Sequence, residues 1–190
     1  MLGLPVTAVD VLDAHSGTTG RARVPTHLDR ELGHWADEMN RVQRGPLPAL
    51  ERFLAELRAT VPAPYRRVTL VHGDAKPGNF AFVDDGVSAV FDWEMATLGD
   101  PLTDIGWLDE LLARYTESSG IAPANREWYR ALNPYKMAVI CLIGSMLYAD
   151  GSTNDERFAL NALGIPLLTQ LGLGALGVTE KLPDGPVRAR

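Results

Sequence analysis

The feature that most constrains the fold of this chain is a short β segment in the middle of an otherwise helical pattern. Residues 68–71 and 79–83 are apolar runs of strand length, and residues 87–92 form a third. The turn Asp84-Asp85-Gly86 joins the last two runs, so we expect them to pair as a β-hairpin. A small hairpin enclosed by helices predicts an α+β domain.

The segments on both sides of this hairpin have helical periodicity. Residues 28–42 and 47–57 each present one apolar face, and Gly45-Pro46 separates them. Thr26 is a candidate N-cap because Asp29 follows three residues later. After the hairpin we expect a helix from Pro101 to about residue 115, and then two or three more helices, roughly over residues 124–132, 135–149 and 154–171.

The first 25 residues follow a different pattern. Alternating apolar residues at 7–12 and 21–24 flank a polar loop that contains two glycines, which is typical of another β-hairpin. Pro25 ends its second strand. We therefore divide the chain into a hairpin unit (1–25), a main domain (26–178) and a loose tail (179–190).

Composition narrows the class of protein. The chain has 190 residues, one cysteine and a net charge of −6, which excludes a disulfide scaffold and disfavours a nucleic-acid partner. The N-terminus lacks the basic flank and apolar core of a signal peptide. The longest apolar stretch, residues 137–148, is shorter than a membrane span. We expect a cytoplasmic protein without a membrane partner.

The residues that carry chemistry gather around the central hairpin. Asp74 can accept a proton, and Asn79 with Asp92 offers oxygen ligands of the kind that Mg²⁺ prefers. Asp92 ends a strand that can pair with the strand beginning at Asn79, so these ligands can meet. Lys76 could offset charge on a transferred group, although loop lysines are usually solvated. Carboxylates this close would repel one another without a cation, so the pattern implies a metal.

This stretch resembles the aminoglycoside phosphotransferase and choline kinase superfamily, whose large lobe has a protein-kinase-like fold. The signature His-Gly-Asp-x-x-x-x-Asn is matched by residues 72–79, and the family's metal-binding aspartate is matched by Asp92. Residues 96–104, Ala-Thr-Leu-Gly-Asp-Pro-Leu-Thr-Asp, look like the branch found in acyl-CoA-dehydrogenase-associated phosphotransferase domains.

The resemblance implies roles for individual residues. Asp74 would be the catalytic base, and Asn79 and Asp92 would be the magnesium ligands. Lys76 would approach the γ-phosphate of ATP. His72 and Asp104 would brace the catalytic loop. The alternative for Asp104 is an ordinary carboxylate in the first turn of a helix, where the helix dipole favours negative charge.

The same resemblance shows a gap in the small lobe. Ser16, Gly17 and Thr18 lie where a phosphate-covering loop is expected, although an ordinary hairpin turn has the same composition. Only two residues separate Val24 from the next helix, so the family's phosphate-pairing lysine and its partner glutamate have no place there. Loss of such preorganised charge weakens catalysis.

Two functions follow as expectations. The first is an ATP- and Mg²⁺-dependent phosphotransferase that acts on a small-molecule alcohol. The alternative is a truncated, catalytically impaired pseudokinase-like module that binds a ligand or partner. The face left by the missing small lobe would be apolar and could support a homodimer.

Overall fold

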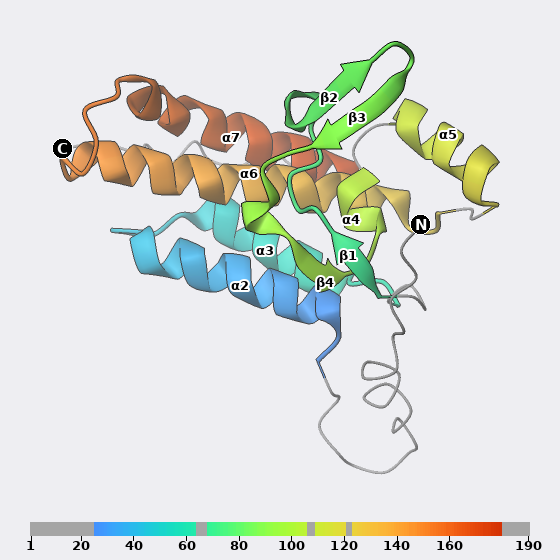
Figure 1. Ribbon diagram of the computed structural model, residues 1–190. Helices are drawn as coiled ribbons and strands as arrows, with labels where there is room; N and C mark the ends of the chain where they lie inside the picture. Colours follow the sequence, from blue (N-terminus) through green and yellow to red (C-terminus); the bar gives the residue numbers. More distant parts are fainter. Residues whose placement is uncertain (1–24, 64–67, 106–108, 121–122, 180–190) are drawn as a thin grey trace.

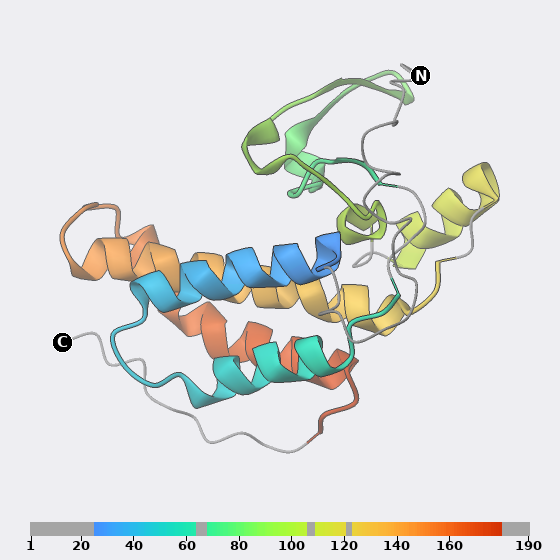
Figure 2. The same cartoon turned by 90° about the horizontal axis from the view of Figure 1, so that it is seen from below.

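The computed structural model describes residues 25–63, 68–105, 109–120 and 123–179, and the side chains of residues 109–111 are not among them. The described part is a mostly helical α+β unit, as the sequence predicts. Figures 1 and 2 show its long helices side by side as one body, with both small sheets on one side of that body. These helices are α2 (His27–Val42), α3 (Pro48–Ala59), α6 (Arg126–Ala149) and α7 (Arg157–Ala175).

Helix α2 begins where the sequence predicts. The Thr26 backbone N–H donates to Asp29 Oδ2 at 2.8 Å, and the Asp29 N–H donates to Thr26 Oγ1 at 3.2 Å. This capping box satisfies two N–H groups that the first turn of a helix leaves without partners, and it confirms the predicted N-cap. The face with Leu28, Leu32 and Met39 is buried.

The core lies between α6 and the other long helices. Tyr135 of α6 is fully buried, and its ring meets Phe53 of α3 edge to face at a centroid distance of 5.4 Å. Trp128 donates its indole N–H to the Leu57 carbonyl at 3.0 Å, which ties α6 to the C-terminal turn of α3. Gly172 of α7 lies so close to the Phe53 ring that a Cβ there would overlap it.

Among the described residues two helices follow α5, the smaller of the two numbers expected, because the segments 124–132 and 135–149 form the single helix α6 with Pro134 inside it. Proline removes one backbone donor and usually breaks a helix. Here Leu132 and Tyr135 on either side are fully buried, so packing holds both halves in line. Helix α7 begins three residues later than predicted and ends at Ala175.

The helix predicted from Pro101 to about residue 115 is described in two parts. Helix α4 covers Leu102–Ile105, and α5 covers Asp109–Ser119, with residues 106–108 between them outside the described part.

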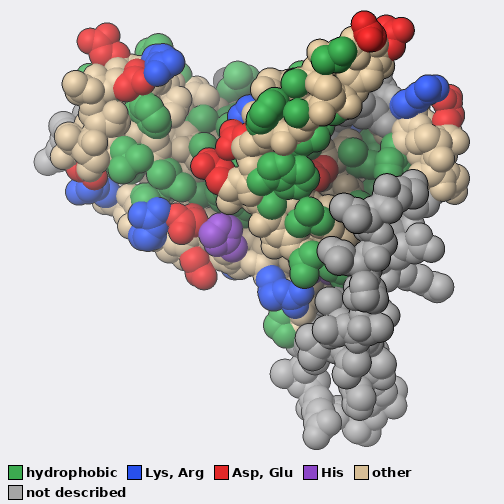
Figure 3. Space-filling view, in the orientation of Figure 1, with side chains coloured by type: hydrophobic (Ala, Val, Ile, Leu, Met, Phe, Trp, Pro, Cys, Tyr) green, Lys and Arg blue, Asp and Glu red, His purple; other side chains and the backbone are tan. Residues whose placement is uncertain are grey.

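The predicted central hairpin is confirmed. Strands β2 (Phe80–Val83) and β3 (Gly86–Val90) pair antiparallel, with Phe80 opposite Val90. Its outward side chains Phe82, Val83 and Val87 are exposed. Figure 3 shows hydrophobic side chains gathered over this hairpin and acidic ones at its tip.

The sequence predicted only one strand of the second two-stranded sheet, the strand over residues 68–71. Strand β1 (Thr69–Val71) pairs antiparallel with β4 (Thr97–Gly99), with Thr69 opposite Gly99. Three residues are too few to show a period, so β4 exists only through its pairing with β1. Leu70 and Leu98 of this sheet are exposed.

Two described helices are long and apolar enough to cross a membrane by length and composition, which corrects the sequence estimate from residues 137–148 alone. In α6, 56% of the apolar window is buried inside the protein, whereas in α7 the share is 22%. The α6 window thus belongs to a protein core, and α7 has an uncovered face. The predicted N-terminal hairpin and nearly all of the predicted tail fall outside the described residues.

Candidate active site

The site is built on the loop between β1 and β2, residues 72–79. Gly73 has a φ of +85°, and a Cβ there would overlap the Met95 backbone, so this position requires glycine. The Asp104 carboxylate of α4 accepts both loop N–H groups, from His72 at 2.7 Å and from Gly73 at 2.8 Å. A single carboxylate therefore holds the start of the loop against the next helix.

His72 holds the loop from the other side. Its Nδ1 accepts the Asp74 backbone N–H at 3.3 Å, so the ring proton of a neutral imidazole belongs on Nε2. Nε2 lies 2.7 Å from the Phe91 carbonyl oxygen and donates to it in that tautomer. The buried ring thus connects the Asp74 backbone to Phe91, the residue that precedes Asp92. The Trp93 ring packs on the His72 ring at a centroid distance of 4.7 Å.

Asp74, Lys76 and Asn79 converge within this loop. Asn79 Nδ2 donates to the Asp74 carbonyl at 2.8 Å and to Asp74 Oδ2 at 3.1 Å. Lys76 Nζ lies 2.6 Å from the same Oδ2 atom. The hydrogen bond to Asp74 raises the pKa of Lys76 despite partial desolvation, and the negative charges of Asp74, Asp92 and Glu94 add to this rise. Asp74 is therefore the direct partner of the Lys76 ammonium group, and Asp92 and Glu94 act on it through their charge.

Asp92 is placed beside Asn79 by the β2–β3 hairpin. The Phe91 N–H donates to the Asn79 carbonyl at 2.8 Å, so Asp92 follows directly on the residue paired with Asn79. Asp92 has a left-handed backbone with φ of 64°, which is uncommon for a residue with a side chain and concentrates at functional sites. Its side chain is exposed to solvent.

The donor set fits a magnesium ion that is carried mainly by a nucleotide. Both Asn79 bonds to Asp74 use Nδ2, so they do not engage Oδ1, the atom that would bind a cation. In the described ranges no three His, Cys, Asp or Glu side chains gather as a metal site. Mg²⁺ usually takes one or two carboxylates and completes its shell with phosphates and water, which matches Asn79 with Asp92.

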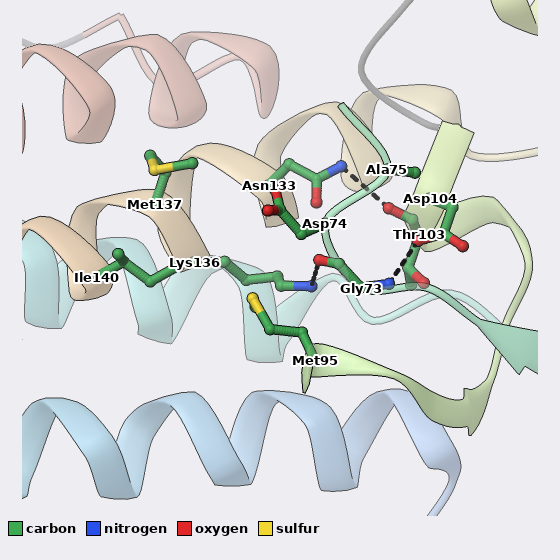
Figure 4. A pocket seen from close by; sticks show the side chains of 10 residues that line it. All are labelled: Gly73, Asp74, Ala75, Met95, Thr103, Asp104, Asn133, Lys136, Met137 and Ile140. Carbon is green, nitrogen blue, oxygen red and sulfur yellow. Dashed lines mark hydrogen bonds between the residues drawn. The ribbon is translucent and has the colours of Figure 1, made fainter. Parts of the chain in front are cut away.

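Lys136 is a site residue that the sequence reasoning missed. It is buried on α6, and its Nζ lies 2.9 Å from Glu31 of α2 and donates to the Gly73 carbonyl at 3.3 Å. Figure 4 shows it reaching from α6 to the loop, across from Asp104. The available signal was a lysine inside the apolar run of residues 135–143, where only a paired charge is tolerated.

Asp100 forms a second buried anchor that the sequence reasoning missed. It is fully buried, and its carboxylate accepts the Leu102 N–H at 2.9 Å and the Tyr129 hydroxyl at 2.8 Å. His27 Nε2 at the start of α2 lies 3.6 Å from the same carboxylate. Asp100, the residue that directly follows β4, therefore bonds to α4 and α6 and lies close to the start of α2.

A groove of about 670 Å³ lies beside the loop, between α2, residues 94–99 and α6. Glu31, Glu38 and Glu94 bring negative charge to it, and Arg30 and Lys136 bring positive charge. A smaller hollow that Asp74 lines shares Gly73 and Lys136 with this groove. The proposed base thus lies next to a space of small-molecule size. Ser16, Gly17 and Thr18, the predicted nucleotide contacts, lie outside the described residues.

Comparisons with known proteins agree with this geometry. A match to the family described as "Phosphotransferase enzyme family" spans residues 9–137. The chain therefore belongs to this phosphotransferase family, as the sequence motif predicts.

The relatives that match this chain are much longer proteins, and the chain corresponds to one part of each. The chain is 36% identical over 95 residues to acyl-CoA dehydrogenase family member 10 of Mus musculus, which covers 49% of this chain and 9% of that protein. It is 27% identical over 197 residues to family member 11 of Rattus norvegicus, which covers 85% of this chain and 25% of that protein. The chain thus spans a quarter or less of these relatives.

A solved structure shows the same fold. It is that of a Ralstonia eutropha protein assigned as an aminoglycoside phosphotransferase, which superposes with a TM-score of 0.70 at 19% sequence identity. The match covers 84% of this chain and 58% of that chain.

Proposed function

We propose that this protein transfers the γ-phosphate of ATP to the hydroxyl group of a small molecule, with Mg²⁺ as the cofactor. The observation that supports this best is the convergence of Asp74, Asn79 and Lys76 in one braced loop. The backbone of Asp92 lies next to this loop, because the preceding residue Phe91 donates its N–H to the Asn79 carbonyl. Phosphoryl transfer needs little more from a protein than a positioned base, oxygen ligands and compensating charge.

Each residue has a defined part in the proposed reaction. Asp74 takes the proton of the acceptor hydroxyl as the new oxygen–phosphorus bond forms and the bond to ADP breaks. Asn79 keeps the Asp74 carboxylate in one orientation through its Nδ2 bonds. Lys76, charged and next to Asp74, offsets negative charge on the transferred group. Asn79 and Asp92 would hold the magnesium, which neutralises charge on the phosphates when bound.

The groove beside Gly73 is the proposed acceptor site. Its volume of about 670 Å³ is that of a pocket for a small ligand. Apolar side chains such as Ile140 and Ile143 line one wall, and the carboxylates of α2 lie on the other. The net charge of −6 speaks against a nucleic-acid partner, so the proposal includes none. The proposal also keeps the cytoplasmic location expected from the sequence.

The alternative is a ligand-binding module with impaired catalysis. It is favoured by the sequence between Val24 and His27, which leaves no room for the lysine and glutamate of a complete small lobe. Such a module would bind Mg²⁺-nucleotide through Asn79 and Asp92 without transferring phosphate at a useful rate.

The test combines turnover with binding. The protein is incubated with Mg²⁺-ATP and a panel of small alcohols, and ADP formation is compared among wild type, Asp74→Asn and Asp84→Asn. Asp74→Asn should lower acceptor-dependent ADP formation by roughly 10²–10⁴-fold, the usual contribution of a general base. Asp84→Asn is the matched control, since Asp84 lies at the tip of the hairpin.

Calorimetry with Mg²⁺-ADP separates the two functions. Nucleotide binding that Asp92→Asn weakens, together with no turnover on any acceptor, would reject the enzyme and support the binding module. If neither turnover nor nucleotide binding is detected, both proposals are wrong.

A further inference from the structure

Helix α7 has an uncovered apolar face. Its inner face, with Ile165, Gly172 and Leu173, is buried against the core. Its outer face presents Leu160, Leu163, Leu167 and Leu171, whose exposed fractions are 65%, 73%, 69% and 62%. We call these four residues the leucine stripe. A helix that is apolar on all sides normally has neighbours on all sides.

The spacing of the leucine stripe is symmetric about its centre. Leu163 and Leu171 lie four residues before and after Leu167, and Leu160 and Gly174 lie seven residues before and after it. At about 100° per residue, all five positions fall on one narrow side of the helix. If two copies of α7 pair antiparallel with Leu167 at the centre, Leu163 therefore meets the partner's Leu171. Leu160 then meets the partner's Gly174.

Charge also favours pairing of two copies. The helix carries no charged residue from Phe158 to its end, although the whole chain has a net charge of −6. Arg157 precedes the stripe at the N-terminal end of α7. Arg157 pairs with Asp155 at 2.6 Å in the monomer, so in the antiparallel arrangement this ion pair, rather than a lone charge, would lie beside the C-terminal end of the partner helix.

We propose that α7 is a dimerisation helix, which pairs through the leucine stripe with α7 of a second copy of this chain about a two-fold axis at Leu167. The exposed leucines amount to on the order of a few hundred Å² per subunit, the size of the largest apolar patch on a monomer. A standard interface covers about 800 Å² per partner, so this dimer is weak, with a Kd on the order of micromolar. This inference does not depend on the proposed phosphotransferase activity.

A membrane surface fits the same face less well. Helices that lie on anionic membranes have several Lys or Arg residues along their polar side, and Arg157 is the only basic residue of α7. The β1–β4 sheet with Leu70 and Leu98 and the β2–β3 hairpin with Phe82 and Val83 are further exposed apolar surfaces in the described part of the chain.

Cysteine cross-linking tests the axis and the register. In a Cys141→Ala background, Leu167→Cys should form a disulfide-linked dimer at micromolar concentration when oxidised with copper phenanthroline, because Leu167 meets its own copy. Leu163→Cys alone should cross-link poorly, whereas a mixture of Leu163→Cys and Leu171→Cys should cross-link well. Leu70→Cys, at 63% exposure, is the matched control and should stay monomeric.

Sedimentation of the uncross-linked protein provides the second readout. Wild type should show a monomer–dimer equilibrium, and Leu167→Glu should be monomeric. Its melting temperature should equal that of wild type measured below the Kd, since the side chain is exposed in the monomer. The proposal is overturned by a wild type that stays monomeric up to about 100 µM, well above the Kd expected for a weak interface. It is also overturned by faster cross-linking of Leu70→Cys than of Leu167→Cys, or by Leu167-dependent binding to anionic phospholipid vesicles without self-association.

Discussion

At the scale of single residues, the site depends on side chains that hold the backbone of the loop rather than on the reacting groups themselves. Asp104 binds two successive N–H groups of the loop, and Lys136 binds the Gly73 carbonyl. Gly73 itself adopts a conformation that residues with a Cβ rarely take. The position of Asp74 is therefore set by residues that are distant in the sequence.

Lys136 and Glu31 should be strongly coupled in stability. Lys136→Met leaves the Glu31 carboxylate partly buried without its cation, and we expect it to lower the free energy of unfolding by about 3–5 kcal/mol. Adding Glu31→Gln to Lys136→Met should recover most of this loss. Urea unfolding of the two single variants and the double variant measures the coupling, and additive effects would contradict it.

Tyr129 should stabilise the fold in a pH-dependent way. Burial, together with the Asp100 charge and the hydrogen bond to it, raises the pKa of Tyr129 in the folded protein. Tyr129→Phe leaves the buried Asp100 carboxylate with one donor fewer, so we expect a loss of about 1–3 kcal/mol near neutral pH.

The pH dependence has a definite sign. Because the folded pKa of Tyr129 lies above the unfolded value of about 10, the wild type loses the stability contributed by Tyr129 as the pH rises past about 10. Tyr129→Phe lacks this contribution, although the buried Tyr135 still gives both proteins a similar loss. The difference in unfolding free energy between the two should therefore shrink above that pH. Urea unfolding of both proteins between neutral pH and strongly alkaline pH measures it, and a difference that grows would refute this account.

At the scale of elements, close helix packing decides what the sequence pattern leaves open. Helix α6 continues through Pro134 because both flanking turns are buried, and β4 forms because β1 is there to pair with it. Neither outcome can be inferred from a local pattern, since proline ordinarily ends a helix and a strand of three residues has no visible period.

Gly172 should be essential to the contact of α7 with α3. In Gly172→Ala the new Cβ would overlap the Phe53 ring, which cannot move because it is fully buried against Tyr135. We expect a loss of about 1–3 kcal/mol from overpacking. Gly33→Ala on α2 is the matched control: a Cβ at Gly33 has open space, so this change should be neutral or stabilising by up to ~1 kcal/mol. Thermal unfolding of the two variants compares them directly, and equal losses would count against the packing argument.

At the scale of the whole molecule, the structure divides into a packed helical body and a site supported at its edge. The long helices share one core, whereas the β2–β3 hairpin exposes Phe82, Val83 and Val87. The exposed side of the hairpin and the leucine stripe of α7 lie on different elements, so they are separate apolar surfaces available to partners.

Hydrogen exchange should reflect this division. Amides in the buried middle of α6, around Leu132 to Leu142, should exchange most slowly because they open only with the core. Amides of β2 and β3 should exchange much faster, since the hairpin has few buried contacts. Exchange followed by mass spectrometry measures both regions. A hairpin protected as strongly as α6 would mean that another chain covers it.

The sequence by itself determined the local features of this protein: the amphipathic face and cap of α2, the β2–β3 hairpin, and the motif of residues 72–79 that identifies the family. Each of these features depends on residues that lie close together in the sequence, so a local pattern is enough to predict it. Only the tertiary structure decided that Lys136 and Asp100 anchor the site and that α7 keeps an open leucine face. Those properties depend on contacts between residues far apart in the chain, which no local pattern records.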